Sequence, residues 1–428
     1  MLPRQKYPNT TELTNHWTEL AVPKARYRNK MHYIRLLRGP KLDASNLKRP
    51  LISILLTITT DLGDSFLYPD EPVDLAISVE NPTGQSVILE ADRPPRWTAG
   101  MRCLDVKVSI KPHLKKDDVT CTIRIHPTTQ TPPLGVLKGS DMLPWRVARG
   151  SPASEGLIMP VSVEMAKGIC SPVAVRTLRL DSRSRSQPRD QMDIDLEEDI
   201  GESIARHIWD AGVVTASFFG DACSTKEGIY DTLPMREDGF NILELGSGVG
   251  ILGITLAQVI ERAVVHGHTS TKATVLLTDL PEAEERARSN ISRAKAAFSH
   301  INPSGSTVAL QYEDLDWDEG KHGQFGTFAS ARPWDLVVLS DCTYNVDSLP
   351  ALVGTLSALH TANLKHDGVE RGAKTFAILA TKPRHSSEQA LFGLLTSDDW
   401  QYNVLKSITL PKLGEEDEAV YIYLLKKG

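Results

Sequence analysis

The chain has 428 residues, of which 41% are hydrophobic and 24% are charged, and its formal net charge is −6. This length exceeds the usual size of one domain and predicts two, each large enough for its own hydrophobic core. The composition is typical of a globular protein, and the small negative charge provides no general attraction for nucleic acid or an anionic membrane. Nucleic acid is therefore not an expected partner. Apolar runs stay well short of the roughly 20 residues that span a bilayer, so no membrane association is expected.

The five cysteines are widely spaced and form neither a CxxC pair nor a cluster with histidines at zinc-ligand spacing. Free thiols in a reducing compartment, and no metal site, are therefore predicted. The N-terminal residues lack the apolar core of a secretory signal. We expect a cytoplasmic protein, and an additional nuclear location is left open. The oligomeric state is left open.

Residues 51–180 are predicted to form a β-rich domain that follows an N-terminal extension, residues 1–50, expected to be partly helical. Apolar Ile52, Ile54, Leu56 and Ile58 alternate with other residues, and stretches near 75, 104 and 119 repeat this pattern. Such a period of two predicts strands with one buried face. Several short strands at this spacing favour a β-sandwich.

Residues 181–199 are predicted to be a charged linker. An Arg/Ser-rich stretch at 182–189 is followed by a mostly acidic stretch at 190–199. With few apolar side chains to offset the entropy of ordering, the segment is expected to stay solvated and flexible. A nuclear-localisation or phosphorylation role for the Arg/Ser stretch is the alternative.

From residue 200 onward the hydrophobic period changes. Ile200, Ile204 and Ile208 fall at helical spacing and predict a helix of about 20 residues before Asp221. Strands and helices then alternate, which is typical of a mainly parallel sheet covered by helices on both faces. The expected strands are 241–245, 274–278, 308–311, 336–339 and 375–380. Two final strands, near 402–408 and 419–425, are joined without room for a helix and should pair antiparallel.

A glycine-rich loop at residues 244–250 follows the first of these strands and opens an apolar helix. This position places the loop at the carboxyl edge of the sheet, where open α/β folds bind ligands. The spacing is GxGxG, and Ile251 stands where a dinucleotide-binding fingerprint has its third glycine. The loop therefore suits the amino-acid and ribose portions of S-adenosylmethionine better than a pyrophosphate. A tight turn with no ligand is the alternative.

The ends of the next two strands carry further candidates. Asp279 ends the second strand, where a carboxylate can accept the hydroxyl hydrogens of a ribose, although it could instead cap the following helix. Residues 264–274, between the glycine loop and Asp279, are interpreted as an inserted surface loop. Trp317 follows the third strand and could lie against a purine, with Asp314 or Asp316 accepting the amino hydrogens; alternatively, Trp317 is a core residue.

The fourth strand runs into Ser340, Asp341 and, three residues later, Tyr344. A carboxylate and a phenol at the same sheet edge could hold an amine close to a sulfonium methyl group. Methyl transfer to a neutral amine needs little acid–base chemistry, so positioning and desolvation should supply most of the rate.

Together these motifs make residues 200–428 resemble the lysine-methyltransferase branch of the seven-strand S-adenosylmethionine-dependent methyltransferases, methyltransferase family 16. The likeness rests on residues 207–211, the loop 244–250, the turn 315–317 and a DxxY motif at 341–344. It implies a Rossmann-like fold, S-adenosyl-L-methionine as cofactor, and Asp341 and Tyr344 as catalytic residues where the target amine enters. The residues that it assigns to the cofactor are Trp209, Glu244, Gly246, Ser247, Gly248, Asp279, Trp317 and Ser340.

The resemblance favours a protein-lysine N-methyltransferase with a protein substrate and an open, acidic channel at Asp341 and Tyr344. A small-molecule N-methyltransferase of the same fold and a non-catalytic interaction protein are the alternatives, and Ile251 argues against a dehydrogenase. An Asn-Pro-Pro-Tyr motif is absent after the fourth strand, which argues against glutamine or adenine as acceptor. The β-rich half lies outside the family core. It either recognises a partner protein or stabilises the catalytic domain.

Overall fold

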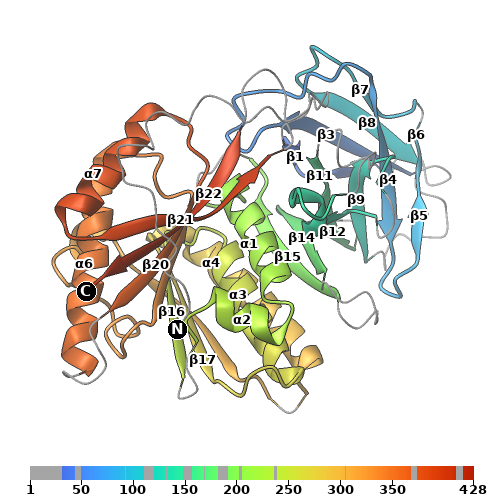
Figure 1. The fold of residues 1–428 in the computed structure, drawn as a ribbon. Coiled ribbons are helices and arrows are strands. Elements are labelled where there is room, and N and C mark those ends of the chain that lie inside the picture. The colour runs from blue at the N-terminus through green and yellow to red at the C-terminus, as the bar shows by residue number, and fades with distance from the viewer. Residues whose placement is uncertain are drawn as a thin grey trace.

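The architecture is seen in a computed structural model (Figure 1). The residues that it describes are 31–43, 50–91, 93–109, 120–130, 134–147, 157–167, 169–181, 191–201, 205–235, 239–303, 305–367, 374–410 and 418–428. Two sheets make up the N-terminal half, and a third sheet with helices on both faces makes up the C-terminal half. This arrangement confirms the predicted fold class.

The N-terminal half is a β-sandwich. The first sheet has the order β11-β1-β3-β8-β6, and β2 also pairs with β3. The second sheet has the order β10-β14-β12-β9-β4-β5; in addition, β13 pairs with β12, β15 pairs with β14, and β7 pairs with β4. The strands of the first sheet are β1 (His32–Leu36), β2 (Lys41–Asp43), β3 (Leu51–Thr59), β6 (Glu90–Ala91), β8 (Leu104–Ser109) and β11 (Ile158–Met159). Those of the second are β4 (Val73–Glu80), β5 (Ser86–Ile88), β7 (Arg96–Trp97), β9 (Cys121–Pro127), β10 (Val136–Lys138), β12 (Val161–Ala166), β13 (Ile169–Cys170), β14 (Val173–Asp181) and β15 (Gln191–Asp199).

The core of the sandwich lies between the two sheets. Ile52, Ile54, Leu56 and Ile58 of β3 are fully buried, as the alternating pattern predicts, and they belong to one cluster with residues of β4, β9 and β12. Trp97 is also fully buried, and its indole Nε1 donates to the backbone oxygen of Leu67 at 2.8 Å. The alternation of hydrophobic residues therefore predicts correctly where strand β3 lies and which of its faces is buried.

Two predicted segments are wrong in their described parts. Residues 32–36 and 41–43 are strands β1 and β2 of the sandwich rather than part of an extension before it, because they pair with β3. The predicted helical part is not tested, because residues 1–30 and 44–49 lie outside the described residues. Residues 191–199 form β15 rather than a linker, paired antiparallel with β14 over nine residues. Met192, Ile194 and Leu196 are buried there between exposed acidic residues, so alternation outweighs charge. Residues 182–190 lie outside the described residues.

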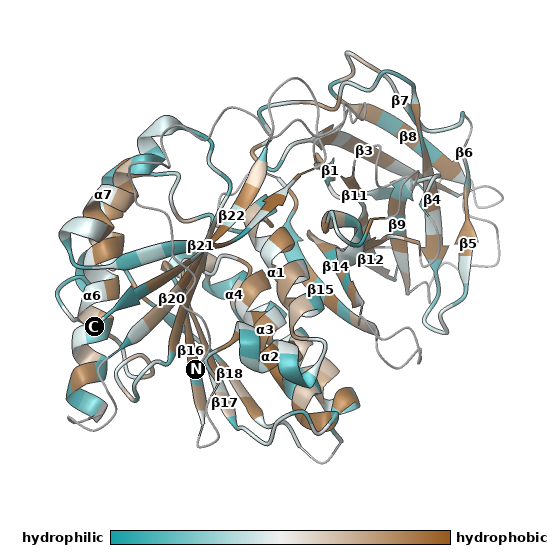
Figure 2. Ribbon diagram, viewed as in Figure 1, coloured by the Kyte–Doolittle hydropathy of each residue, from teal (hydrophilic) through white to brown (hydrophobic). Residues whose placement is uncertain are grey.

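The C-terminal half is a seven-stranded sheet of order β18-β17-β16-β19-β20-β22-β21. The central strands are parallel, whereas β22 pairs antiparallel with both β20 and β21, as predicted. The strands are β16 (Phe240–Leu245), β17 (Ala273–Asp279), β18 (Val308–Asp314), β19 (Leu336–Ser340), β20 (Thr375–Thr381), β21 (Gln401–Thr409) and β22 (Ala419–Lys427). Figure 2 shows hydrophobic residues along much of the central strands.

Helices cover both faces of this sheet. Helices α1, α2, α3 and α4 pack with one hydrophobic cluster, and α6 and α7 with another. Their bounds are α1 (Asp210–Ala222), α2 (Lys226–Thr232), α3 (Ile251–Val265), α4 (Pro281–Ile301), α5 (Trp317–Gly320), α6 (Leu349–Asp367) and α7 (Ala390–Ser397), with short 3₁₀ turns η1 (Gly139–Met142), η4 (Val346–Ser348) and η6 (Ser386–Gln389). None of the described helices is long and apolar enough to cross a membrane.

Two predicted boundaries in this half need correction. Helix α1 begins at Asp210 and has 13 residues, rather than about 20 from residue 200, because carboxylates of Asp61 and Asp341 accept the first backbone N–H groups of the helix. Residues 202–204 lie outside the described residues. The expected insertion at 264–274 is shorter, since α3 continues to Val265 and β17 starts at Ala273.

The two halves share a core. One hydrophobic cluster contains Tyr33 of β1 and Ile194 of β15 together with residues of α1, α3 and β16. At the same junction Glu197 of β15 forms ion pairs with Arg286 and Arg293 of α4, each at 2.8 Å. The sandwich is therefore packed directly onto the face of the seven-stranded sheet that α1, α3 and α4 cover.

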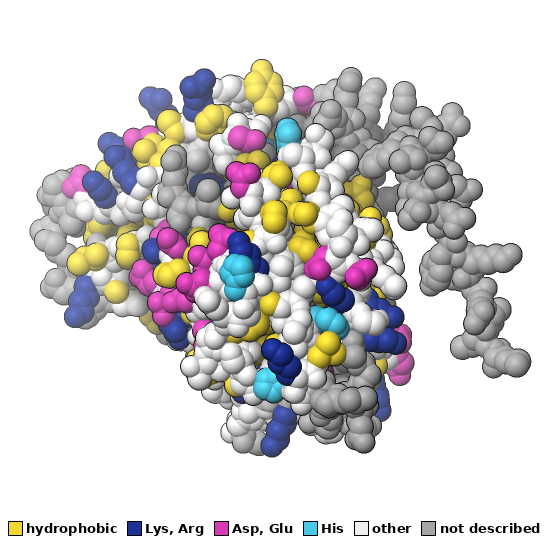
Figure 3. All heavy atoms as spheres, turned by 90° about the vertical axis from the view of Figure 1, so that its left-hand side faces the viewer, with side chains coloured by type: hydrophobic (Ala, Val, Ile, Leu, Met, Phe, Trp, Pro, Cys, Tyr) yellow, Lys and Arg dark blue, Asp and Glu magenta, His cyan; other side chains and the backbone are white. Residues whose placement is uncertain are grey.

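The outer surface on the side of α6 and α7 carries interspersed charges. In Figure 3 basic and acidic side chains alternate over this face, and acidic side chains gather in one visible group. This mixed pattern differs from the continuous basic stripe typical of nucleic-acid binding.

Candidate active site

The glycine loop after β16 has a backbone that other residues would not tolerate. Gly246, Gly248 and Gly250 have φ angles of +65°, +53° and +87°, in the left-handed region. A Cβ atom on Gly246 would lie 2.6 Å from Cys342 Sγ and 3.1 Å from Trp317 Cζ2. The loop is therefore pressed against both the β19 turn and the first residue of α5. This contact brings three of the predicted motifs together at one sheet edge.

Asp279 joins the end of β17 to this loop. Its Oδ2 accepts from Gly248 N and its Oδ1 from Leu280 N, each at 2.7 Å. Burial raises the pKa of Asp279, and the two backbone donors oppose this effect. The predicted ribose role fits this geometry, because each carboxylate oxygen has a second lone pair for a ligand hydroxyl. The alternative role as a cap of α4 does not fit, because Leu280 is the N-cap of α4 and, among the described residues, no side chain accepts from the first N–H groups of that helix.

Glu244 lies behind the loop rather than at its mouth. The side chain is buried, and its Oε2 accepts from Gly253 N of α3 at 2.9 Å. Burial raises the pKa of Glu244 to about 8. This hydrogen bond thus connects the end of β16 to the first turn of α3, and it stabilises the loop that joins them.

Ser247 and Trp317 also lie at this loop. Ser247 Oγ is buried and has no hydrogen-bond partner among the described residues, so it is available to a ligand. Trp317 is half-buried, with its ring edge beside Gly246. Asp316 caps α5 by accepting from Asp318 N at 2.8 Å, while Asp314 is exposed.

Asp341 is buried, and this overturns the prediction of an open acidic channel. Its Oδ1 accepts from Arg384 Nη1 at 2.7 Å, and its Oδ2 accepts from Ala211 N at 2.7 Å and Gly212 N at 3.3 Å. Burial raises the pKa of Asp341, and the Arg384 guanidinium opposes that rise. The carboxylate is therefore engaged within the protein, whereas Tyr344, three residues on, is 56% exposed. Of Asp341 and Tyr344, only Tyr344 is therefore exposed to solvent.

Residues 188–398 match the family model described as lysine methyltransferase. This part of the chain belongs to the lysine-methyltransferase family. Protein N-lysine methyltransferase METTL21A of Danio rerio is 28% identical over 163 residues, which cover 37% of this chain and 57% of that protein. EEF1A lysine methyltransferase 3 of Xenopus tropicalis is 28% identical over 158 residues, 36% of this chain and 53% of that protein.

A further relative matches over a longer stretch. A UPF0665 family protein of Schizosaccharomyces pombe is 30% identical over 230 residues, 54% of this chain and 55% of that protein. The chain thus spans little more than half the length of the curated relatives that it matches. Among solved structures, the rRNA methyltransferase aviRa from Streptomyces viridochromogenes aligns with 52% of this chain and 88% of its own, at 11% identity and a TM-score of 0.32. That likeness is too low to bear on function.

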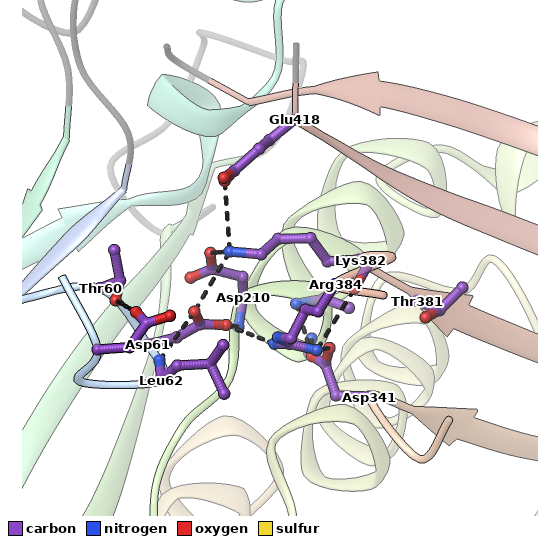
Figure 4. Close-up of polar contacts among 12 residues, drawn as sticks. Thr60, Asp61, Leu62, Asp210, Asp341, Thr381, Lys382, Arg384 and Glu418 are labelled. Carbon is purple, nitrogen blue, oxygen red and sulfur yellow. Dashed lines mark hydrogen bonds and ion pairs between the residues drawn. The ribbon is translucent and has the colours of Figure 1, made fainter. Parts of the chain in front are cut away.

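The lysine-methyltransferase domain contains site residues that sequence reasoning missed. Lys382 and Arg384 follow β20, and Figure 4 shows their cationic ends between the carboxylates of Asp61, Asp210 and Asp341. Because β20 lies beside β19, the topology alone could have placed both cations at this edge. Asp61 comes from the sandwich, and no sequence pattern around it marks it as a site residue.

The remaining predicted residues lie around this network. Trp209 immediately precedes α1, and its ring centroid is 5.5 Å from the guanidinium carbon of Arg384. Ser340 ends β19 next to the first turn of α1, where its Oγ would be 3.4 Å from a Cβ on Gly212. The structure thus places both residues at the same sheet edge as the loop, on the α1 side.

Proposed function

We propose that this chain is an S-adenosylmethionine-dependent protein-lysine N-methyltransferase. The observation that carries the proposal is the convergence of the glycine loop, Asp279, Trp317 and the 341–344 turn at one edge of a lysine-methyltransferase-family sheet. Open α/β sheets bind their ligands at this edge.

The residues at this sheet edge fit the cofactor. The positive-φ backbone at Gly246 and Gly248 allows close approach of its amino-acid portion, and the unpartnered Ser247 Oγ supplies a hydrogen bond. Asp279 would accept from the ribose hydroxyls, and the Trp317 ring would lie against the adenine. When bound, S-adenosylmethionine supplies a methyl group on a sulfonium centre.

The acceptor side supports an amine. Tyr344 is the exposed member of the DxxY turn, and burial of part of its ring raises the pKa of its phenol, so the hydroxyl stays protonated at neutral pH. Such a hydroxyl can both donate to and accept from an approaching amine. The matched relatives named for lysine methylation, METTL21A and EEF1A lysine methyltransferase 3, favour a lysine on a protein as the acceptor.

The test uses the full chain, methyl-labelled S-adenosylmethionine and a cell lysate. Wild type is compared with Gly248→Arg, which places a long side chain in the loop, and with the control Gly267→Arg. Gly267 also has a positive φ but has open space around its Cβ position. We expect label in a protein fraction with wild type and the control, and none with Gly248→Arg. Label confined to small molecules would contradict a protein acceptor, and equal labelling by Gly248→Arg would contradict the cofactor site.

A further inference from the structure

Asp61 belongs to the β-sandwich by sequence, yet its side chain lies in the lysine-methyltransferase domain's charged network. The residue follows β3, and its carboxylate is 1% exposed. Oδ2 lies 2.6 Å from Arg384 Nη2, and Oδ1 lies 3.2 Å from Lys382 Nζ (Figure 4). Both partners are more than 300 residues away in the chain, as their separations of 323 and 321 show.

The turn that carries Asp61 is held firmly by its own hydrogen bonds. Thr60 N donates to Ser65 O at 3.0 Å, and Leu62 N donates to Asp61 Oδ1 at 3.0 Å. Arg35 of the neighbouring strand β1 donates from Nη2 to Asp61 O at 2.7 Å. The sandwich therefore presents the carboxylate in one orientation, with little freedom to move away from the cations.

Arg384 bridges the two domains through its guanidinium group. Nη2 contacts Asp61, and Nη1 contacts Asp341 Oδ1 at 2.7 Å. The planar fork of an arginine presents adjacent nitrogens to two separate carboxylates, a geometry that a lysine ammonium does not reproduce. Loss of Asp61 would leave Nη2 of a buried cation without this carboxylate, so the orientation of Arg384 depends on the sandwich.

Asp341 in turn depends on Arg384 for its conformation. Its φ of +53° is uncommon for a residue other than glycine, so surrounding contacts must hold it there. Those contacts include Arg384 on Oδ1 and two backbone N–H groups of α1 on Oδ2, and Asp341 N also donates to Ala380 O at 3.0 Å. Because Tyr344 lies only three residues after Asp341 in the same turn, the direction of this turn sets where the exposed phenol lies.

A second link from the sandwich supports the same arrangement. Tyr33 of β1 donates its hydroxyl to Asp210 Oδ1 at 2.7 Å, and Asp210 Oδ2 accepts from Lys382 Nζ at 2.6 Å. Asp210 N also donates to Asp61 Oδ2 at 3.3 Å, at the first residue of α1. The start of α1 and the turn after β20 are thus both held by side chains of the β-rich domain.

We propose that Asp61 is a positioning residue for methyl transfer, acting through Arg384 and Asp341 on the turn that carries Tyr344. The β-rich domain is then a structural part of the catalytic unit rather than a separable recruiting module. This inference rests on the proposed function. It assigns to the sandwich a role in the rate of transfer, distinct from cofactor binding.

The test compares full-length wild type with Asp61→Asn, which keeps the shape of the side chain and removes its charge. Asp64→Asn is the matched control, because Asp64 is an exposed aspartate of the same turn that accepts from Thr60 Oγ1. Methyl-labelled S-adenosylmethionine and lysate protein give the maximal rate and the half-saturating acceptor concentration. Calorimetry with S-adenosylmethionine gives the cofactor Kd, and thermal unfolding checks the fold.

We expect Asp61→Asn to lower the maximal rate about 10- to 100-fold, because small misplacements of reacting groups have effects of this size. The cofactor Kd and the half-saturating acceptor concentration should stay within about twofold of wild type. Asp64→Asn should match wild type. A folded Asp61→Asn with an unchanged maximal rate would overturn the proposal.

If Asp61→Asn does not fold, Arg384→Lys decides the question, because it keeps the cation but not the two-pronged bridge. The same loss of rate supports the proposal, and an unchanged rate overturns it. Absence of transfer by the wild type would be a failure of the proposed function, whereas equal rates for wild type and both variants would be a failure of the present inference alone.

Discussion

Replacement of Gly246 by alanine should both destabilise the protein and weaken cofactor binding. The new methyl group would meet Cys342 Sγ at 2.6 Å and Trp317 Cζ2 at 3.1 Å, so both side chains must move. Overpacking of this kind costs about 1–3 kcal/mol. The left-handed backbone, with φ of +65°, adds about 1–2 kcal/mol for any residue that has a Cβ atom. The free energy of unfolding should therefore fall by about 2–5 kcal/mol.

Gly267→Ala separates these two contributions. Gly267 has a similar φ of +69°, but no atom lies within 4 Å of its Cβ position. Its substitution should cost only the backbone part, about 1–2 kcal/mol, and should leave cofactor affinity unchanged. The assay is urea unfolding of the full chain together with calorimetric titration of S-adenosylmethionine. Equal destabilisation by the two alanines, with equal affinity for the cofactor, would refute the assignment of the loop as a closely packed part of the cofactor site.

Three further predictions concern other carboxyl groups. Asp279→Asn should weaken S-adenosylmethionine binding about 10- to 100-fold in calorimetry, since a hydrogen bond to a charged group contributes about 1.5–3 kcal/mol, whereas exposed Asp105→Asn should not change it. Burial raises the pKa of Glu244 to about 8 from 4.5, so between these pH values the folded protein keeps a proton that the unfolded chain releases. The contribution of this proton to the free energy of unfolding is complete below about pH 4.5 and is lost as the pH rises toward 8. Glu244→Gln should flatten this pH dependence in urea titrations at several pH values. Glu197→Ala should lower the free energy of unfolding by about 1.5–3 kcal/mol, because Arg286 and Arg293 lose the carboxylate that they share, while Arg286 keeps Asp199 and Glu285 and Arg293 keeps Glu164. Asp193→Ala, which breaks the more exposed pair with Arg179, should cost about 1 kcal/mol or less, and comparable losses for the two variants would contradict this account.

Local patterns allowed much of the second domain to be predicted. The strands around the glycine loop, the position of Asp279 at the end of β17 and the antiparallel pairing of β21 and β22 follow from hydrophobic period and connection length. Each of these features depends on residues that are near one another in sequence.

Other features were wrong or missed because they depend on distant residues. The acidic composition of 191–199 suggested solvation and hid the local alternation of Met192, Ile194 and Leu196, and the distant Arg286 and Arg293 neutralise Glu197. The burial of Asp341 depends on Arg384 and on α1, and Arg384 depends in turn on Asp61. Long-range ion pairs of this kind leave no periodic signal in either segment.

The chemical identity of the methylated product tests the central claim most directly. Lysate protein labelled by the wild type with methyl-labelled S-adenosylmethionine is hydrolysed to amino acids, and the labelled species is identified by mass spectrometry. The proposed function predicts label in methylated lysine, and none when Gly248→Arg replaces the wild type. Label in another amino acid, or in a small molecule only, would contradict it.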